Sequence, residues 1–365
     1  MRVLHVIARM NVGGTATYLS NLISGLQKSG VSSLLAMGQV PRGEAEDTVV
    51  EELPIRRIYH LSREIAPMND LKSHKEIQQA ISEFKPDLIH SHTFKAGFLV
   101  RTGKLDVPEV HSFHGHHLYD PEFGRFKRKA LNLIEKRLAK KSDAIITIGS
   151  KVKDELLEVG IGRSDQYISI PPGIVAPEVR DSEAVRHRLR IGSKEIVVMW
   201  LGRFTAVKRP DHVIELAKQF PEATFVMAGG GELLDANKES SPSNVHFVGF
   251  EDKNDMWSIA DIGLCTSNSE GMPLSLIEAQ MAGVPVVSTD VGSVSEIVVD
   301  GVTGRLATRQ IDSLVSALRP LIQSKAMRTT MGQSAKKRAS ELFDADVMVQ
   351  AHLRLYRDLL DRVSR

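Results

Sequence analysis

Two glutamates, Glu270 and Glu278, flank a proline in the stretch SEGMPLSLIE at residues 269–278. Pro273 suits the first position of a helix, where its missing N–H needs no partner, and the residues after it predict a helix over 274–281. The first N–H groups of such a helix favour a phosphate, while carboxylates accept hydrogen bonds from hydroxyl groups. The stretch therefore predicts a site for a polyol attached to a phosphate. The alternative is two solvent-exposed glutamates.

A pair of cations occurs in GRFTAVKRP at residues 202–210. Arg203 ends a predicted strand, and Lys208 precedes a helix predicted to begin at Pro210. An arginine can bind two oxygens in a fork and a lysine adds a compact positive charge, so the pair suits a diphosphate leaving group. The alternative is two cations on the solvated surface.

A glycine pair, Gly13 and Gly14, follows the first predicted strand in NVGGTATYL at residues 11–19. Such a loop lets backbone N–H groups approach an anion closely. The spacing is not that of G-x-G-x-x-G, so a nicotinamide dinucleotide site is only weakly supported. The alternative is a tight turn with no ligand.

Histidines gather in HSFHGHHL at residues 111–118, after another predicted strand. His114, His116 and His117 suggest a metal site, but metal ligands need a fixed geometry and usually an acidic or thiolate partner, which the local sequence lacks. We therefore expect no metal. We expect one histidine, His114 beside the flexible Gly115, to contact a substrate oxygen.

Two further stretches resemble ligand sites but have simpler explanations. The sequence GGGELL at 229–234 lacks the Lys-Ser/Thr of a P-loop, so it predicts a tight turn whose glycines allow close packing. Asp344 and Asp346 form an Asp-x-Asp pair that could hold a divalent metal, but Asp346 is better explained as a helix N-cap.

Short β-branched segments alternate with amphipathic segments, which predicts an α/β protein with parallel sheets covered on both faces. The predicted strands are 3–8, 33–37, 87–92, 110–113, 144–148, 167–170, 196–201, 224–228, 245–248, 262–265 and 284–288. The predicted helices are 15–28, 71–84, 126–140, 151–159, 210–220, 273–281 and 346–362, with shorter ones between 220 and 273.

With 365 residues the chain is long enough for two domains. We expect an N-terminal doubly wound domain over 1–172, a polar linker over 173–194 and a second such domain over 195–345. The last helix, about 346–365, is expected to pack on the first domain. The two Rossmann-like sheets would direct their strand carboxyl ends towards a shared cleft.

The composition excludes several classes of protein. The net charge of +2 is too small to indicate a nucleic-acid partner. The single cysteine, Cys265, excludes an intrachain disulfide and fits a reducing cytosol. There is no apolar run of about 18 residues that could span a membrane. The opening MRVLHVIARM is predicted to be a strand and not a signal peptide, so we expect a cytoplasmic protein.

One segment is strongly basic: residues 123–141 hold eight Lys and Arg against one acid, Glu135, with a helical apolar stripe. A basic amphipathic helix can lie on anionic lipid, so this segment suggests peripheral contact with the inner face of the cytoplasmic membrane. The alternative is a helix packed on the sheet with a solvated cationic face.

Together these motifs resemble the GT-B fold glycosyltransferases of the retaining family 4 type, over nearly the whole chain. The most specific part is residues 269–304, which resembles the family's E-x7-E segment. The resemblance implies that Glu270 holds the hydroxyls of the donor sugar and Glu278 those of the ribose. The residues between them that would belong to the same nucleotide-sugar site are Gly271, Met272, Pro273 and Leu274.

The same resemblance implies that Arg203 and Lys208 bind the diphosphate, that Gly13 and Gly14 face the donor phosphate and the acceptor, and that His114 contacts the donor sugar. The implied activity is a metal-independent, retaining transfer of a sugar (EC 2.4). The donor would be a nucleotide sugar, with UDP the favoured base. The acceptor would be a saccharide or a lipid-linked molecule in the synthesis of cell-surface polysaccharide or glycolipid. The alternatives are a nucleotide-sugar epimerase of the same architecture and a catalytically silent nucleotide-sugar-binding protein.

Overall fold

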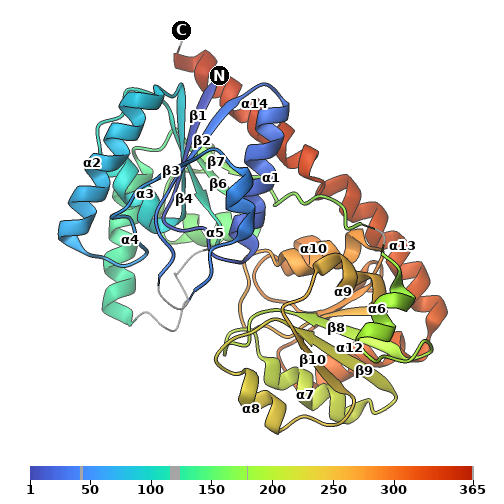
Figure 1. The fold of residues 1–365 in the computed structure, drawn as a ribbon. Coiled ribbons are helices and arrows are strands. Elements are labelled where there is room, and N and C mark those ends of the chain that lie inside the picture. Colours follow the sequence, from blue (N-terminus) through green and yellow to red (C-terminus); the bar gives the residue numbers. More distant parts are fainter. Residues whose placement is uncertain (42–43, 116–123, 179, 364–365) are drawn as a thin grey trace. The chain divides into compact units, whose positions relative to one another are not determined.

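The computed structural model of the chain describes residues 1–41, 44–115, 124–178 and 180–363 (Figure 1). The chain forms two compact units. The first comprises Met1–Ile174 and Ala345–Arg365, and the second comprises Val175–Asp344. The first unit therefore contains residues from both ends of the described chain.

The sheet of the first unit is entirely parallel, in the order β3-β2-β1-β4-β5-β6-β7. Its strands are β1 (Arg2–Ile7), β2 (Ser32–Met37), β3 (Ile55–Arg57), β4 (Leu88–His92), β5 (Glu109–Phe113), β6 (Ala144–Thr147) and β7 (Tyr167–Ser169). Its helices are α1 (Gly14–Lys28), α2 (Pro67–Phe84), α3 (Thr93–Thr102), α4 (Arg125–Ala139), α5 (Ser150–Glu158) and α14 (Ala345–Val363), with short 3₁₀ turns at Thr48–Glu52 and Ser164–Gln166. The sheet reverses its order of growth at the β1–β4 pair, where doubly wound folds bind ligands.

Helices cover both faces of this sheet, because both faces of its strands carry buried side chains. Val3 and Ile7 of β1 pack with α1 and α14, whereas Leu4 and Val6 pack with α2 and α3. Figure 1 shows α14 beside α1, although more than 300 residues separate them in the sequence. The first unit is thus completed by the last helix of the chain.

The sheet of the second unit is also parallel, in the order β10-β9-β8-β11-β12-β13. Its strands are β8 (Ile196–Leu201), β9 (Ala223–Ala228), β10 (Val245–Gly249), β11 (Ile262–Cys265), β12 (Val286–Thr289) and β13 (Gly304–Ala307). Its helices are α6 (Ser182–Arg188), α7 (Pro210–Gln219), α8 (Leu234–Glu239), α9 (Lys253–Ile259), α10 (Leu274–Met281), α11 (Val294–Ile297), α12 (Ile311–Gln323) and α13 (Lys325–Leu342). Here the order reverses at the β8–β11 pair.

The prediction of two doubly wound parallel α/β sheets is confirmed, but the segment 173–194 differs from the irregular linker that we expected. Most of it belongs to the second unit, and it contains α6. Arg188 binds the carboxylates of Glu251 and Asp255, and Arg186 binds the carbonyl of Ile259. The polar residues that suggested a linker are therefore the residues that fasten α6 to α9 and its flanking loops.

Of the two stretches to which we gave simpler explanations, the structure confirms the prediction for 229–234 and contradicts the prediction for Asp346. Gly229 has φ +127°, and a side chain there would collide with the carbonyl oxygen of Gly202, so the glycine turn permits the close packing that we predicted. The backbone N–H of Phe204 donates to the carbonyl of Gly230 at 2.9 Å. The N-cap prediction for Asp346 is wrong, because this residue lies inside the first turn of α14.

Candidate active site

The loops that follow β8 and β11 meet at the reversal point of the second sheet. The first loop carries Arg203 and Lys208, and the second carries Glu270. Parallel neighbouring strands end at the same edge of a sheet, so the topology brings together side chains that lie more than 60 residues apart. This edge is the candidate active site of the second unit.

Lys208 and Glu270 contact each other directly. The Nζ of Lys208 donates to Oε1 of Glu270 at 2.5 Å, and the hydroxyl of Ser267 donates to the same oxygen at 2.5 Å. The Glu270 side chain is 9% exposed and that of Lys208 is 25% exposed. The interpretation of these residues as solvated surface charges is therefore wrong. Sequence reasoning did not find Ser267, although its position three residues before Glu270 places it on the same loop.

Backbone contacts fix these two loops against each other. The hydroxyl of Thr266 donates to the carbonyls of Lys208 and Arg209 at 3.0 and 2.9 Å, and the N–H of Asn268 donates to the carbonyl of Val207 at 2.8 Å. The turn after β12 packs against the loop that carries Glu270. Gly292 has φ +57°, and any side chain there would collide with the carbonyl oxygen of Glu270. The carboxylate of Glu270 is thus held in one place before any ligand binds.

Arg203 lies on the same loop as Lys208, and its side chain is exposed. It follows β8, which ends at Leu201, and its backbone is held where the glycine turn after β9 packs against the loop. An exposed guanidinium on the loop that also carries Lys208 can reach oxygens of an anion bound at this edge of the sheet. The structure thus places both predicted cations on one loop.

Glu278 is buried, and it has partners that sequence reasoning missed. Its side chain is 8% exposed, its Oε1 accepts from Nζ of Lys253 at 2.8 Å, and its Oε2 accepts from the indole N–H of Trp257 at 3.5 Å. Both partners come from α9, which shows no motif that could have identified them. The alternative of an exposed helix glutamate is wrong for this residue. The Lys253 side chain, at 48% exposure, remains open to solvent.

The helix that carries Glu278 spans Leu274–Met281, as predicted. Pro273 is its N-cap, with φ −71° and ψ 117°, and not its first helical residue. The difference is one position, and the reason for a proline there is unchanged, since neither position donates an intrahelical hydrogen bond. Gly271 and Met272 complete the loop, and the carbonyl of Gly271 accepts from the N–H of Ser293 at 2.8 Å.

In the first unit the glycine pair opens α1 at the reversal point of the sheet. Gly13 has φ +152° and precedes the helix, which begins at Gly14. A side chain at Gly13 would meet no atom within 4 Å, so the backbone conformation and not the available space explains this glycine. Its carbonyl accepts from the N–H groups of Ala16 and Thr17. The loop therefore leads directly from β1 into the first turn of α1.

His114 follows β5 and is partly exposed. Its Nε2 lies 3.1 Å from Nδ1 of His92, the last residue of β4, and the ring of Tyr18 meets it edge-on at 4.6 Å between centroids. Burial lowers the pKa of His114 to about 4, so the imidazole is neutral at pH 7. The site thus offers a neutral histidine held by two aromatic neighbours.

The other two histidines of the predicted stretch, His116 and His117, lie outside the described residues. Within the part of the chain that the structure describes, ligand nitrogens of His5, His90 and His92 lie within 4.8 Å of one another, which is close enough to consider a metal. Their existing hydrogen bonds to one another, to Tyr356 and to Ser112 give a different explanation.

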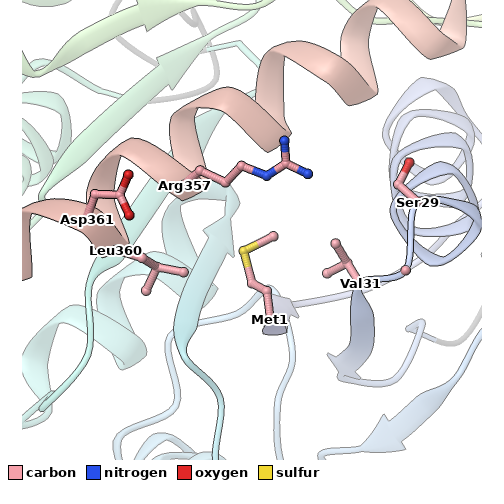
Figure 2. Close-up of a pocket in the computed structure, with 7 residues that line it drawn as sticks. Met1, Ser29, Val31, Arg357, Leu360 and Asp361 are labelled. Atoms are coloured by element: carbon pink, nitrogen blue, oxygen red, sulfur yellow. The ribbon is translucent and has the colours of Figure 1, made fainter. Parts of the chain in front are cut away.

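A surface cavity of about 320 Å³ lies elsewhere in the first unit (Figure 2). Met1 and Val31, which precede β1 and β2, line it together with Arg357 and Asp361 of α14. It lies at the amino ends of the strands, opposite the edge that carries Gly13 and His114. It is therefore separate from the predicted site.

Known sequence families match both halves of the chain. Residues 12–176 match the family described as Glycosyltransferase Family 4, and residues 181–338 match the family described as Glycosyl transferases group 1. The chain belongs to the family 4, group 1 glycosyltransferases. It is therefore an enzyme of the glycosyltransferase class, EC 2.4, with the GT-B fold.

Individual relatives agree with this assignment. The glycosyltransferase is 26% identical over 327 residues to an Escherichia coli protein described as UDP-Gal:alpha-D-GlcNAc-diphosphoundecaprenol alpha-1,3-galactosyltransferase, covering 82% of each chain. Sucrose-phosphate synthase from Thermosynechococcus elongatus has a similar structure (TM-score 0.85, 19% identity, 99% and 100% covered). So does HepE of Anabaena, solved in complex with UDP and glucose (TM-score 0.84, 20% identity, 98% and 100% covered). At these identities the structural likeness shows the fold.

Proposed function

We propose that this glycosyltransferase moves a sugar from a UDP-sugar to a saccharide or lipid-linked acceptor with retention of anomeric configuration and without a metal. The observation that carries the proposal is the contact of Lys208 with Glu270 at the reversal point of the second sheet. A cation for the diphosphate and a carboxylate for the sugar hydroxyls lie side by side there. The presence of UDP and glucose in HepE supports the same class of donor.

In the proposed reaction the C1–O bond to the diphosphate breaks, and its electron pair goes to the phosphate oxygen. Arg203 and Lys208 stabilise the negative charge that develops there, together with the first N–H groups of α10. Glu270 accepts hydrogen bonds from the sugar hydroxyls, and Glu278 from those of the ribose. The acceptor hydroxyl attacks C1 from the face that the diphosphate leaves, and its proton passes to the departing phosphate oxygen. His114 contacts the donor sugar, and Gly13 and Gly14 contact its phosphate.

The test is release of nucleotide from UDP-, GDP- and ADP-sugars in the presence of EDTA. We expect slow release from one donor without an acceptor, faster release with lipid-linked saccharides, and no loss of rate in excess chelator. Strict dependence on magnesium would contradict the metal-independent mechanism. Thermal stabilisation by a donor without any release under either condition would instead support the silent binding protein, and release of an epimerised sugar would support the epimerase.

The surface of α4 supports a lipid-linked acceptor. None of the helices in the described part of the chain combines the length and apolar character that crossing a membrane requires. The single acid of the segment, Glu135, points inward and pairs with the fully buried Arg101 at 3.0 Å. Five cations of the same segment have exposed side chains: Lys129, Lys136, Arg137, Lys140 and Lys141. Leu133 adds an apolar side chain that is 51% exposed. This surface suits anionic lipid, and the diphosphoundecaprenol named for the E. coli relative is a lipid-linked acceptor.

Reversing three of these charges, Lys136→Glu, Arg137→Glu and Lys140→Glu, is expected to abolish salt-sensitive binding to vesicles that contain anionic lipid. Each cation near such a surface contributes about 1 kcal/mol, so reversing three should lower the affinity by about 100-fold or more. Co-sedimentation with vesicles at two salt concentrations measures the effect. The matched control reverses three exposed lysines of α13, Lys325, Lys336 and Lys337. Equal sedimentation of both variants would remove the membrane contact from the proposal.

A further inference from the structure

A group of histidines lies on one face of the first sheet, and the established activity does not account for it. We use the name histidine cluster for five residues: His5 of β1, His90 and His92 of β4, His114 after β5, and His352 of α14. The parallel register pairs His5 with His90, and alternation along β4 places His92 on the same face. All except His114 are completely buried. The cluster therefore leads from the interior of the unit to its one partly exposed member.

One branch of the cluster has an unambiguous direction. Nδ1 of His352 lies 2.8 Å from the carbonyl oxygen of Met348, so this nitrogen must carry the proton and donate. Its Nε2 then accepts from the hydroxyl of Tyr18 at 2.9 Å. Tyr18 is the residue whose ring packs edge-on against His114. The last helix of the chain thus fixes one neighbour of His114.

The second branch is a chain of three imidazoles. Nδ1 of His5 lies 3.2 Å from Nε2 of His92, and Nδ1 of His92 lies 3.1 Å from Nε2 of His114. Each neutral imidazole has one donor nitrogen and one acceptor nitrogen, so all the protons in this chain point the same way. The remaining nitrogen of His5, Nε2, is buried without a partner.

That unpaired nitrogen decides the direction. If the chain donated towards His5, a buried N–H at Nε2 would have no acceptor, which native proteins avoid more strictly than an unused lone pair. The favoured arrangement therefore donates from His5 to His92 and from His92 to His114. Nε2 of His114 is the acceptor at the end of the chain, and Nδ1 of His114 carries the proton.

We propose that His92 is a positioning residue that holds His114 in the Nδ1–H tautomer, so that His114 presents an N–H donor to an oxygen of the substrate. The assignment of a substrate contact to His114 rests on the proposed function, whereas the tautomer does not. A neutral N–H donor that is already held in the right orientation does not have to reorganise when a substrate oxygen binds beside it or gains negative charge. Burial lowers the pKa of His5 to about 3 and that of His92 well below its usual range, so the chain stays neutral at pH 7.

The backbone next to His92 supports this role. Thr93 has φ +65°, a left-handed conformation that is a genuine outlier for a β-branched residue. Such strain costs about 1–3 kcal/mol and persists where surrounding contacts impose it. It lets α3 begin directly after the last strand residue, so that His92 ends β4 without an intervening loop. The junction of β4 and α3 thus fixes the backbone at His92.

A metal ion is the rival explanation of the cluster. Both nitrogens of His90 already have partners at 2.6 Å, the hydroxyls of Tyr356 and Ser112. His5 and His92 direct nitrogens at each other. Each histidine would offer one nitrogen to a metal, which would have to replace at least two of these contacts, so the hydrogen-bonded chain is the simpler account. Metal analysis of the purified protein tests this directly, and one tightly bound zinc per chain would overturn the proposal.

The main experiment measures the tautomer of His114 by ¹⁵N NMR of histidine-labelled protein, assigned with a His114→Asn variant. We expect the Nδ1–H tautomer in the unmodified chain. In His92→Phe, which removes the donor, we expect His114 to revert to the Nε2–H tautomer that free histidine favours. The rate at which the enzyme turns over the nucleotide sugar should then fall by about 10- to 100-fold, with a larger change in kcat than in KM. An Nε2–H tautomer in the unmodified chain would overturn the proposal.

Two conservative variants separate positioning from packing. The amide nitrogen of asparagine occupies the place of histidine Nδ1, and that of glutamine the place of Nε2. His92→Asn should therefore restore the Nδ1–H tautomer and most of the turnover lost in His92→Phe, whereas His92→Gln should restore neither. Equal behaviour of these two variants would indicate a structural role only. If the tautomers follow this pattern but no donor is consumed, the proposed function fails and the positioning by His92 stands.

Discussion

Glu270→Gln is expected to lower turnover of the donor by at least about 100-fold while changing the melting temperature little. The carboxylate accepts from Lys208 and Ser267 on one oxygen, Oε1. Glutamine has nearly the same shape, but it has no charge to offset Lys208 and only one acceptor atom. In the proposed reaction it can neither orient the sugar hydroxyls fully nor keep Lys208 in place for the diphosphate. Steady-state kinetics with the preferred donor measure the effect.

Glu278→Gln is the matched comparison, because Glu278 is the second glutamate of the family's E-x7-E segment and is also largely buried. Its proposed partner is the ribose, far from the breaking bond, so its loss should raise KM for the donor more than it lowers kcat. Binding of UDP alone should weaken more in Glu278→Gln than in Glu270→Gln, because Glu278 is the residue proposed to contact the ribose. A kcat for Glu270→Gln within a few-fold of the unmodified enzyme would exclude this residue from the transition state.

Acidification from pH 7 to 5 is expected to unfold the first unit before the second. The pKa of His5 is lowered to about 3 and that of His352 to about 4, in both cases mainly by burial. A lowered folded-state pKa gives stability that is present above about pH 6.5 and is lost as the pH falls, because the unfolded chain binds the proton first. At pH 5 each of these two residues removes about 2 kcal/mol, out of a total stability of about 5–15 kcal/mol.

Other buried groups of the same unit act on this balance. Burial also lowers the pKa of His90, His92 and His111 well below its usual range, so they add to the loss. Glu109 acts in the opposite direction. Burial raises its pKa to about 7, so its protonation stabilises the folded state as the pH falls from 7 towards 4.5. Burial raises the pKa of Glu135 as well, and these two carboxyl groups offset part of the effect of the histidines.

The aromatic residues allow the two units to be followed separately in the intact chain. The two tryptophans, Trp200 and Trp257, belong to the second unit, and the five tyrosines to the first. Loss of the near-ultraviolet circular dichroism of tyrosine should therefore precede the change in tryptophan fluorescence during acid titration. Coincident transitions, or a tryptophan transition that comes first, would contradict the assignment of acid sensitivity to the buried histidines.

The sequence predicts most of this fold because its signals are local. Most of the predicted strands lie within one or two residues of their observed positions, since most of them carry a short run of apolar side chains that are buried in the structure. The helix α3 was missed because it starts at Thr93 directly after a strand, without a polar loop or cap to mark it. The strand β13 was missed because four residues, two of them Gly304 and Arg305, give no strand pattern.

In the candidate site, too, some features have a local sequence signal and others depend on the tertiary structure. The motifs that contain Lys208 and Glu270 are visible in the sequence, and the strand order explains why they meet. The burial of Glu278 depends on Lys253 and Trp257 of a separate helix, and no local pattern links them. The histidine cluster joins residues 5 to 352, so only the tertiary structure reveals it. Alternating histidines in a buried strand, as in LIHSH at 88–92, are the one signal that could have indicated it.

The return of α14 to the first unit determines the order in which the two units can be completed on the ribosome. All residues of the second unit precede Ala345, so its core can close while the chain is still being synthesised. The core of the first unit includes Met348, Leu353 and Tyr356, and its face beside α1 stays uncovered until they emerge. The nascent chain therefore carries an exposed apolar surface for nearly the whole of its synthesis, and the unit that begins first is finished last.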